Sequence, residues 1–502
     1  MIRSGNELTE DLVVEAPACV VGLGAGGSVV LRALARAGLP AVALEEGSDH
    51  TPFQFNQREE QMIPELFQER GGRMTDDLAI QVLQGRGVGG STIHNTNLCK
   101  RTPTEILELW ARRYGVEGCG PRDMEAAFQT IERDLSVSRI PDDGINPNND
   151  ALRRGIAALG WRGGVLSHNR VGCIGSGFCE LGCAYDAKRN ARKVLIPEAL
   201  DRGARIFSDV RATRILHDRK QVLGVEGRTA GGRRVTVRTK VVVLAGSAVG
   251  SAALAIASEL PDPHLQQGEH LRIHPGGVVA GVFDQPIDGW KGIPQSYECT
   301  EWLDLDEKSD KRVWITTAFA HPIGTAVVLP GFGAAHMKSM RGYRHLAVLT
   351  AMLHDESAGH VWLKDGTRTM LHYEMNEGDR RQMVIGLRAC ARILLAAGAR
   401  EVVVPAVPPL TIRREAEIER IDANVVRPHN IPLTAVHPMG TMRMGREPKT
   451  SVVRSTGEHH HVRGVFVADG SLFPTSLGGP PQISIYAFAE HLSPHIVAAA
   501  RG

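Results

Sequence analysis

Three glycines near the start of the chain have the spacing of a turn that binds phosphate groups. They lie in the run Gly22-Leu23-Gly24-Ala25-Gly26-Gly27, and Glu45 follows about twenty residues later. Gly22 permits a tight turn, Gly24 lets the backbone approach a pyrophosphate, and Gly27 lets a helix pack on a strand. The Glu45 carboxylate can accept hydrogen bonds from ribose hydroxyl groups. This pattern predicts a dinucleotide-binding site.

The segments around these glycines predict the elements that such a site requires. A short run of apolar residues at 18–21 precedes the turn, residues 28–37 have helical periodicity, and a second apolar run at 41–44 ends at Glu45. The order is therefore strand, turn, helix, strand and acid. NAD and FAD share this fingerprint, so the choice between them depends on other segments.

A second glycine-rich segment favours a flavin. Residues 85–95 contain too many glycines for the interior of a helix or strand, which predicts a loop whose backbone lies close against a ligand. The edge of an isoalloxazine ring is a suitable ligand. Near the C-terminus, an extended segment at 462–471 is followed by Pro480, Pro481 and a helical run over 482–499. The positive end of that helix suits the negative charge of a reduced flavin.

Two clusters of possible metal ligands, three cysteines and a run of histidines, are interpreted as structural features and not as metal sites. Cys173, Cys179 and Cys183 lie close together, and Ser176 stands where a ferredoxin-type run has its fourth cysteine. Three thiolates suffice for a three-iron cluster, but the glycines of this segment favour a packed, lid-like loop, and we expect no bound metal. The run of histidines at 459–461 is interpreted as a solvated loop.

Composition limits the classes of partner. The chain has 502 residues, of which 42% are hydrophobic, and it is expected to form interleaved domains. Lys and Arg (58) nearly balance Asp and Glu (56), which argues against nucleic acid as a partner. The uncharged stretch 241–258 is interpreted as a buried strand turning into a helix, so we expect no transmembrane segment. Acids within the first fifteen residues interrupt any signal sequence, and we expect a cytoplasmic protein.

Together these segments resemble the glucose/methanol/choline (GMC) flavoprotein oxidoreductases. Residues 241–258 look like the strand and turn that rejoin the FAD domain of that family, and residues 434–441 look like its active-site signature. Segments 271–275 and 290–297, with the cysteine cluster, are most similar to the branch that contains long-chain fatty alcohol oxidases. The resemblance covers most of the chain.

The resemblance implies an α/β fold in which a Rossmann-like FAD-binding domain is interleaved with an α+β substrate domain built on an antiparallel sheet. The implied FAD-binding domain is discontinuous, with residues 1–110, 165–270 and 430–502. The substrate domain would comprise residues 271–430, and 111–164 would be a connecting helical segment. Such boundaries come by analogy with the family.

The resemblance also implies which residues bind FAD. His94 stands where some members attach the flavin covalently, so a covalent bond and simple packing against the flavin both remain open. Asn95 and Asn97 are expected to contact the flavin ring. The full expected set is Gly22, Gly24, Gly26, Gly27, Glu45, Arg86, Gly90, Ser91, His94, Asn95, Asn97, Val210, Ala245, Asp469, Gly470, Pro481 and Gln482.

The implied reaction is oxidation of an alcohol to a carbonyl compound. The hydride goes to flavin N5, and a base near neutral pKa takes the hydroxyl proton. By resemblance that base is His437, which precedes Pro438 in the signature. We expect a small, apolar alcohol as substrate, with oxygen or another molecule as electron acceptor.

One position departs from the family pattern. The family usually has a second His or an Asn where this chain has Pro480, and proline has no side-chain donor for the substrate oxygen. His429 and Asn430 are possible substitutes. The alternative function is an FAD-containing lyase or decarboxylase without net oxidation of its substrate. A purely structural FAD-binding protein is the weakest alternative, because the whole signature around His437 is present.

Overall fold

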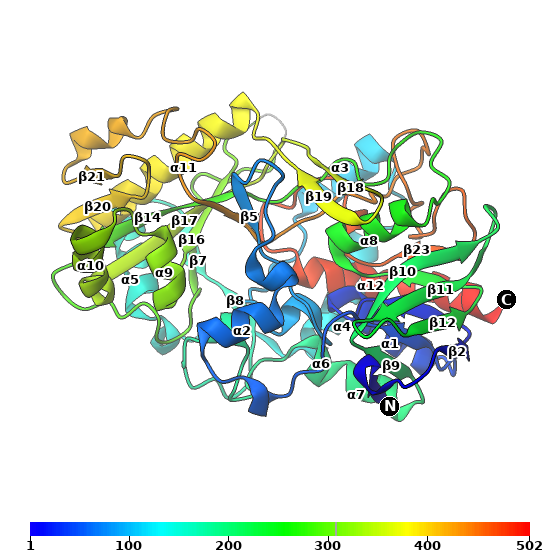
Figure 1. Cartoon of the computed structure of the whole chain (residues 1–502). Helices are drawn as coiled ribbons and strands as arrows, with labels where there is room; N and C mark the ends of the chain where they lie inside the picture. Colours follow the sequence, from blue (N-terminus) through cyan, green and yellow to red (C-terminus); the bar gives the residue numbers. More distant parts are fainter. Residues whose placement is uncertain (307–308) are drawn as a thin grey trace.

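The computed structural model describes residues 1–306 and 309–502 and contains two main sheets (Figure 1). In the first sheet the strand order is β1-β9-β4-β3-β13-β23, and all neighbouring strands are parallel. Its strands are β1 (Ile2–Ser4), β3 (Cys19–Val21), β4 (Val42–Leu44), β9 (Arg205–Ser208), β13 (Val242–Leu244) and β23 (Val465–Val467). The predicted Rossmann-like fold is confirmed.

Most strands of this sheet are short apolar runs because helices cover the sheet and bury them. Every residue of β3, β4, β13 and β23 is buried, as expected for parallel strands with both faces covered. Helix α1 (Ala25–Arg36) packs against α12 (Gln482–Arg501), and α12 in turn packs against α4 (Pro121–Asp134). The two ends of the chain therefore build one layer (Figure 1).

A smaller sheet lies beside the first, in the order β10-β11-β12-β2. Its strands are β10 (Val210–His217), β11 (Val222–Thr229), β12 (Arg234–Arg238) and β2 (Leu12–Glu15). The remaining elements near this part of the molecule are α3 (Thr104–Tyr114), α6 (Ala191–Val194), α7 (Ile196–Asp201), α8 (Ser247–Ala257), and the strand pairs β18 (His360–Lys364) with β19 (Arg368–His372) and β6 (Val137–Arg139) with β8 (Ser167–Asn169).

The second main sheet has the order β21-β20-β14-β17-β16-β15-β7; off this path, β22 pairs with β14 on one side and with β5 on the other. Its strands are β5 (Ile80–Val82), β7 (Gly163–Val165), β14 (Gly276–Val282), β15 (Tyr297–Cys299), β16 (Val313–Thr317), β17 (Leu346–Leu353), β20 (Glu401–Val404), β21 (Leu410–Ile412) and β22 (Leu433–Ala435). Apart from β22 with β5, its pairs are antiparallel. The predicted antiparallel sheet is therefore present.

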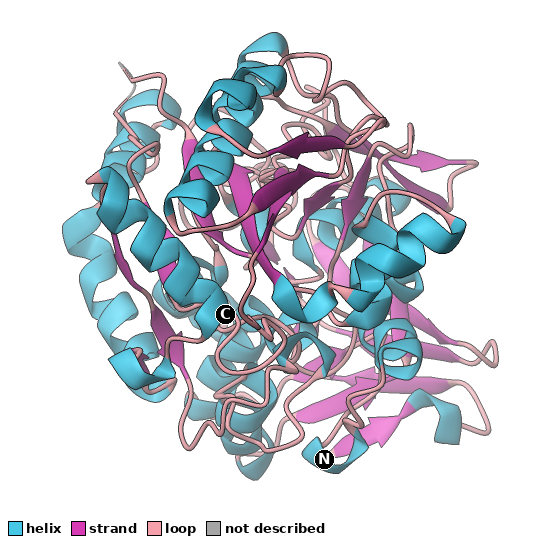
Figure 2. Ribbon diagram, turned by 90° about the vertical axis from the view of Figure 1, so that its left-hand side faces the viewer, coloured by secondary structure: helices cyan, strands magenta, loops and turns pink. Residues whose placement is uncertain are grey.

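Helices α5 (Pro147–Leu159) and α11 (Glu377–Ala396) cover this sheet, and Figure 2 shows helices lying against its strands. Strands β5, β7 and β22 come from outside residues 271–430 but pair within the second main sheet. The predicted FAD-binding and connecting segments therefore contribute strands to the sheet of the predicted substrate domain. The division into domains stays a prediction, and these three strands cross its predicted boundaries. Within the described residues, no helix combines the length and the apolar character that crossing a membrane requires.

Replacement of Gly26 by alanine should destabilise the fold. A Cβ at Gly26, in α1, would lie 1.6 Å from the carbonyl oxygen of Ala468, which follows β23. We expect Gly26→Ala to lower the free energy of unfolding by about 1–3 kcal/mol. Gly250→Ala is the matched control, because Gly250 lies in α8 with nothing within 4 Å of the new Cβ. Urea denaturation checks both, and equal stabilities would contradict the packing argument.

Candidate active site

One large cavity lies between the two main sheets. Its volume is about 1670 Å³, which exceeds the roughly 300–1,000 Å³ of a site for one small ligand and leaves room for a dinucleotide beside a substrate. Every residue predicted to bind the cofactor lines this cavity except Gly27. The tertiary structure therefore brings together residues that are scattered from position 22 to position 482.

The first glycine-rich turn has the geometry expected from the sequence. Gly22 follows β3 with φ +92°, and a Cβ there would lie 2.5 Å from the carbonyl oxygen of Ala245. A Cβ on Gly27 would lie 2.0 Å from the carbonyl oxygen of Gly22, so this glycine lets α1 pack tightly on the strand. Gly27 thus has a packing role, which explains why it does not line the cavity.

The two glycine-rich segments meet at Gly24 and Gly90. A Cβ on Gly90 would lie 2.7 Å from the Cα atom of Gly24, and both residues line the cavity. Gly24 is the N-cap of α1, and no side chain there caps the first amides of the helix. Bare backbone at the positive end of a helix is a suitable place for a pyrophosphate.

Glu45 connects the two segments. Its Oε2 accepts a hydrogen bond from the Leu23 amide at 2.9 Å, and its Oε1 accepts from the amides of Gly47 at 2.9 Å and Gly87 at 3.2 Å. Burial raises the pKa of Glu45 to about 7, although these amides lower it. Glu45 also lines the cavity, where its carboxylate can accept hydrogen bonds from ribose hydroxyl groups.

His94 offers an unpartnered nitrogen to the cavity. Its ring lies 4.0 Å from the ring of Phe67, and its Nε2 has no hydrogen-bond partner among the described residues. Burial, reinforced by the Lys188 charge, lowers the pKa of His94 to about 3, so the ring is neutral. Lys188 is itself buried and donates to the carbonyl oxygens of Ile93 and Asn95. A neutral, free nitrogen fits both packing against a flavin and attachment to it.

The second glycine-rich segment is tied to the start of α12. The Asn95 amide donates to Gln482, the first residue of that helix, and Gln482 donates to the carbonyl oxygen of Leu98 at 3.2 Å. Asn97 has φ +66°, and its buried Oδ1 has no partner among the described residues. These amides line the cavity beside the uncapped N-terminus of α12, as a flavin ring requires.

The other predicted cofactor residues lie at strand ends and turns. Val210 begins β10, Ala245 follows β13, and Ser91 accepts from the Gly85 amide at 2.8 Å. Arg86 donates to the carbonyl oxygen of Glu46 at 3.3 Å. Asp469 follows β23, where its Oδ1 accepts from the Ser471 amide at 2.8 Å. Burial raises the pKa of Asp469.

His437 enters the same cavity from the second sheet. It follows β22, and the next residues run beside the turn after β23: the Gly440 amide donates to the carbonyl oxygen of Gly470 at 3.2 Å. Gly440 has φ +93°, and a Cβ there would lie 2.4 Å from the carbonyl oxygen of His270. Burial lowers the pKa of His437 well below its usual value, and the neighbouring His274 ring lowers it further. His437 is therefore neutral near pH 7.

A second histidine, His274, contacts His437 from behind. The two Nδ1 atoms are 3.3 Å apart and the rings are nearly perpendicular at 84°. His274 Nε2 accepts a hydrogen bond from the Leu477 amide at 3.2 Å. Because an amide can only donate, the proton of neutral His274 is on Nδ1, and His437 Nδ1 accepts it. This arrangement leaves the proton of His437 on Nε2.

Asp355 holds the segment that carries His274. The buried carboxylate accepts from the Ile273 amide at 3.0 Å, from the Tyr373 hydroxyl at 2.7 Å and from the Ser476 hydroxyl at 2.8 Å. It therefore joins the segment before β14 to the turn before α12. Sequence reasoning did not assign a role to His274 or Asp355. The dipeptide His274-Pro275, which repeats His437-Pro438, was the available signal for His274.

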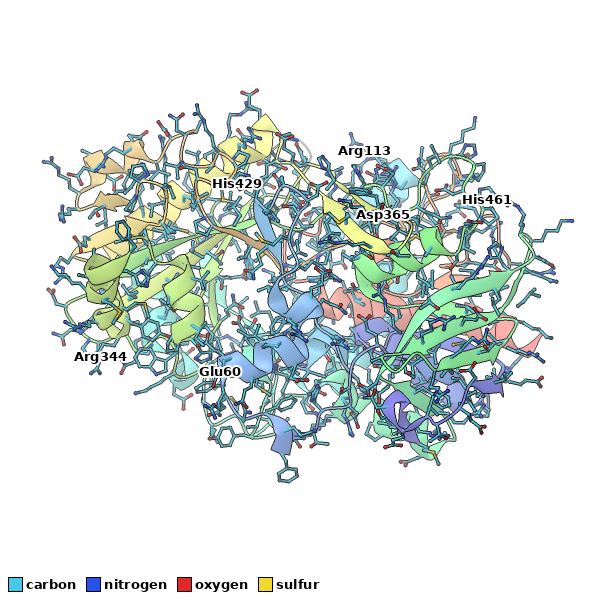
Figure 3. The ribbon with its side chains drawn as sticks, viewed as in Figure 1. Glu60, Arg113, Arg344, Asp365, His429 and His461 are labelled. Atoms are coloured by element: carbon cyan, nitrogen blue, oxygen red, sulfur yellow. The ribbon has the colours of Figure 1, made fainter. Side chains whose placement is uncertain are left out.

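The suggested replacements for the donor missing at Pro480 are wrong. Pro480 does line the cavity, but neither His429 nor Asn430 does. His429 is exposed, and Figure 3 shows it near the outer edge of the molecule. The Asn430 amide donates to the carbonyl oxygen of Asn424 at 2.7 Å. The loop that carries them ends before β22, so neither side chain reaches the site.

The histidine run is also not the solvated loop that the sequence predicted. His459 is buried, and its Nδ1 accepts from the amides of His461 and Val462. Its ring thus closes the turn that leads into β23. His461, in contrast, is exposed.

The three clustered cysteines are free thiols, with Cys173 exposed and Cys179 and Cys183 half-buried. Their loop packs closely: a Cβ on Gly177 would lie 1.8 Å from the carbonyl oxygen of Trp290. No group of three or more His, Cys, Asp or Glu side chains within 1–306 and 309–502 is arranged to hold a metal ion. The absence of iron stays a prediction.

The substrate side of the cavity is mainly apolar. Strands β14, β17 and β20 contribute Val278, Val348 and Val403 to its wall, and β17 adds Met352. A separate helical segment, α9 (Pro322–Val328), forms another side.

Comparison with known proteins agrees with this site. Residues 63–276 and 355–489 match the GMC oxidoreductase family. An uncharacterized GMC-type oxidoreductase of Mycobacterium tuberculosis is 33% identical over 490 residues, covering 97% of this chain and 76% of that protein. A long-chain-alcohol oxidase of Arabidopsis thaliana is 27% identical over 532 residues, covering 99% of this chain and 69% of the relative.

Solved structures show the same fold. Pyridoxine 4-oxidase from Mesorbium loti superposes with a TM-score of 0.73 at 18% identity, over 95% of this chain and 98% of that one. Formate oxidase superposes with a TM-score of 0.69 at 14% identity, over 98% and 99% of the two chains. The two family matches and the relative at 33% identity show that the chain belongs to the GMC oxidoreductases and is an FAD-dependent oxidoreductase acting on alcohol-like donors.

Proposed function

We propose that the protein oxidises the CH–OH group of an apolar alcohol to a carbonyl group, with His437 at the substrate oxygen. The observation that carries the proposal is the position of His437: it lines the cavity that holds the predicted cofactor residues, whose wall from β14, β17 and β20 is mainly apolar. When bound, FAD supplies the hydride acceptor. Gly24, Gly90 and Glu45 would hold its nucleotide half, and Asn95 with Gln482 would face its ring.

His437 can meet the substrate in two protonation forms. In the arrangement fixed by Leu477 and His274, His437 Nε2 carries a proton and binds the substrate oxygen as a donor. To accept the hydroxyl proton, Nε2 must be empty, so both rings change tautomer: the proton of His437 is then on Nδ1 and the proton of His274 on Nε2. The buried Leu477 amide loses its acceptor, which costs about 1–3 kcal/mol. His437 therefore serves first as donor and then as base.

An apolar substrate follows from the wall opposite the predicted flavin site. The valines of β14, β17 and β20, with Ile323, Val327 and Val328 of α9, gain free energy by contact with hydrocarbon, at about 25 cal/mol per Å² removed from water. A strongly polar substrate would leave its hydroxyl groups without partners there. The non-oxidative alternative, a lyase or decarboxylase, has no support in the comparisons and is not proposed.

Removal of the His437 side chain should separate cofactor binding from chemistry. We expect His437→Ala to keep FAD but to slow reduction of the flavin by an alcohol about 10²–10⁴-fold, because the group that handles the hydroxyl proton is lost. Anaerobic stopped-flow absorbance measures this rate. His429→Ala is the control, since that exposed residue lies outside the cavity. Reduction of His437→Ala at the wild-type rate would show that another group is the base.

Glu45 should make FAD binding depend on pH. Its pKa near 7 means that the carboxyl group is partly protonated in neutral solution, and only the ionised form accepts two ribose hydroxyl groups fully. We expect tighter FAD binding at pH 8 than at pH 6, and little such dependence in Glu45→Gln. The variant should also bind more weakly at pH 8, by on the order of 1.5–3 kcal/mol. Fluorescence titration of the apoprotein with FAD tests this. Identical pH profiles of FAD binding in wild type and Glu45→Gln would show that Glu45 is not the group responsible.

Pro480→Asn tests whether the missing donor limits the reaction. Pro480 lines the cavity close to the start of α12, so an amide at this position can reach a substrate oxygen. We expect faster flavin reduction by an alcohol, up to about the 10²–10³-fold that one oxyanion donor contributes elsewhere. Stopped-flow rates of the variant and wild type at saturating alcohol provide the measurement. An unchanged rate would mean that His437 alone already supplies the necessary hydrogen bond.

A further inference from the structure

The segment 322–341 forms a flap over the cavity. It comprises α9, a connecting loop and α10 (Gly333–Arg341), and neither helix contains a buried residue. Ile323, Val327 and Leu329 nevertheless line the cavity. The flap therefore has one side toward the substrate site and another toward solvent. Figure 1 shows α10 at the outer edge of the molecule, far from the parallel sheet.

The outer side of the flap exposes large apolar side chains. Phe332 is 90% exposed and Met337 is 55% exposed, and neither lines the cavity. Val327 and Ile323, which do line the cavity, also have exposed surface. Four such residues within one short segment form a concentrated apolar patch, whereas scattered single exposures are ordinary on protein surfaces. An exposed apolar patch of this kind is typical of a surface that contacts an apolar partner.

The charge around the patch is positive. Residues 311–354 contain no Asp or Glu. On α10, Lys338 and Arg341 are exposed and have no ion-pair partner within the described part of the chain. Arg344 follows the flap and pairs with Asp288 at 3.2 Å, and Figure 3 shows Arg344 at the same outer edge.

Two of the three acids of α2 (Glu59–Leu66), the helix that meets the flap, are already engaged, whereas Glu65 is exposed and forms no ion pair among the described residues. Glu59 is buried and accepts from the amides of Ile323 at 2.8 Å and Gly324 at 2.9 Å, which fixes the start of α9. Glu60 pairs with Arg58 at 2.8 Å. Glu59 and Glu60 therefore do not neutralise the cations of α10, and none of the described acids, Glu65 included, forms an ion pair with Lys338 or Arg341.

We infer that the flap docks on a bilayer containing anionic lipid. Exposed aromatic and aliphatic side chains beside Lys and Arg are the pattern of a segment that lies in the membrane interface. A second copy of this chain fits less well, because two flaps face to face would oppose Lys338 and Arg341 with the same charges. The purpose of this docking rests on the proposed function: an apolar alcohol dissolved in the bilayer would pass along the flap residues that also line the cavity.

The test is sedimentation of the FAD-loaded protein with vesicles. We expect binding to phosphatidylcholine vesicles that contain phosphatidylglycerol, weaker binding to phosphatidylcholine alone, and release by salt. F332S/M337S should weaken binding by about tenfold or more, because the buried apolar contact is lost. K338E/R341E should weaken binding to the anionic vesicles by a similar factor but change binding to phosphatidylcholine little.

F53S is the matched control. Phe53 is 99% exposed but lies outside the flap, in the turn Pro52–Gln54, so its replacement should leave vesicle binding unchanged. Retained flavin absorbance shows that each variant is folded. None of these residues lines the cavity, so oxidation of a water-soluble alcohol should also be unchanged.

The outcomes separate this inference from the proposed function. Absent vesicle binding, or equal loss in F53S and F332S/M337S, overturns the docking surface even when the alcohol is oxidised. Dimerisation that F332S/M337S abolishes, without vesicle binding, shows instead that a second copy covers the patch. Vesicle binding without reduction of the flavin by any alcohol leaves the docking surface in place and refutes the proposed reaction.

Discussion

The close approach of two backbone segments at Gly24 and Gly90 is the constraint on which the site depends. A single Cβ at Gly90 would lie 2.7 Å from the Gly24 Cα atom, so these segments meet only as bare backbone. Glu45 holds them together by accepting amide hydrogen bonds from both. The N-terminal end of α1 and the second glycine-rich loop are thereby placed on one cavity, with little freedom to separate.

The second sheet brings His437 to that cavity. Strand β22 pairs with β14 and with β5, a strand that comes from the N-terminal part of the chain, so the strand that precedes His437 is held by both halves of the molecule. Behind it, Asp355 fixes the segment that carries His274, and the Leu477 amide fixes the orientation of the His274 proton. Three segments distant in sequence thus decide where His437 carries its proton.

The same cavity connects this polar end to an apolar surface. Side chains from β14, β17 and β20 form its wall, and the flap extends the apolar lining to the outside of the molecule. The single side-chain carboxylate that anchors the flap, Glu59, is buried and satisfied by two backbone amides. The cavity thus has His437 in its wall and the flap at its outer side.

The sequence alone predicted the first glycine turn and the strands and helix around it, because those signals are local. Glu45, predicted from the same unit, and His437, predicted from the family resemblance, both line the cavity, and their roles stay predictions. Spacing within one strand–turn–helix unit reports directly on backbone conformation and on the ligand that fits it. It could not place His429 or Asn430 outside the site, show that His459 is buried, or reveal the pairing of His274 with His437. These depend on contacts between segments more than a hundred residues apart, or on how a loop packs, and a one-dimensional pattern carries no record of such contacts.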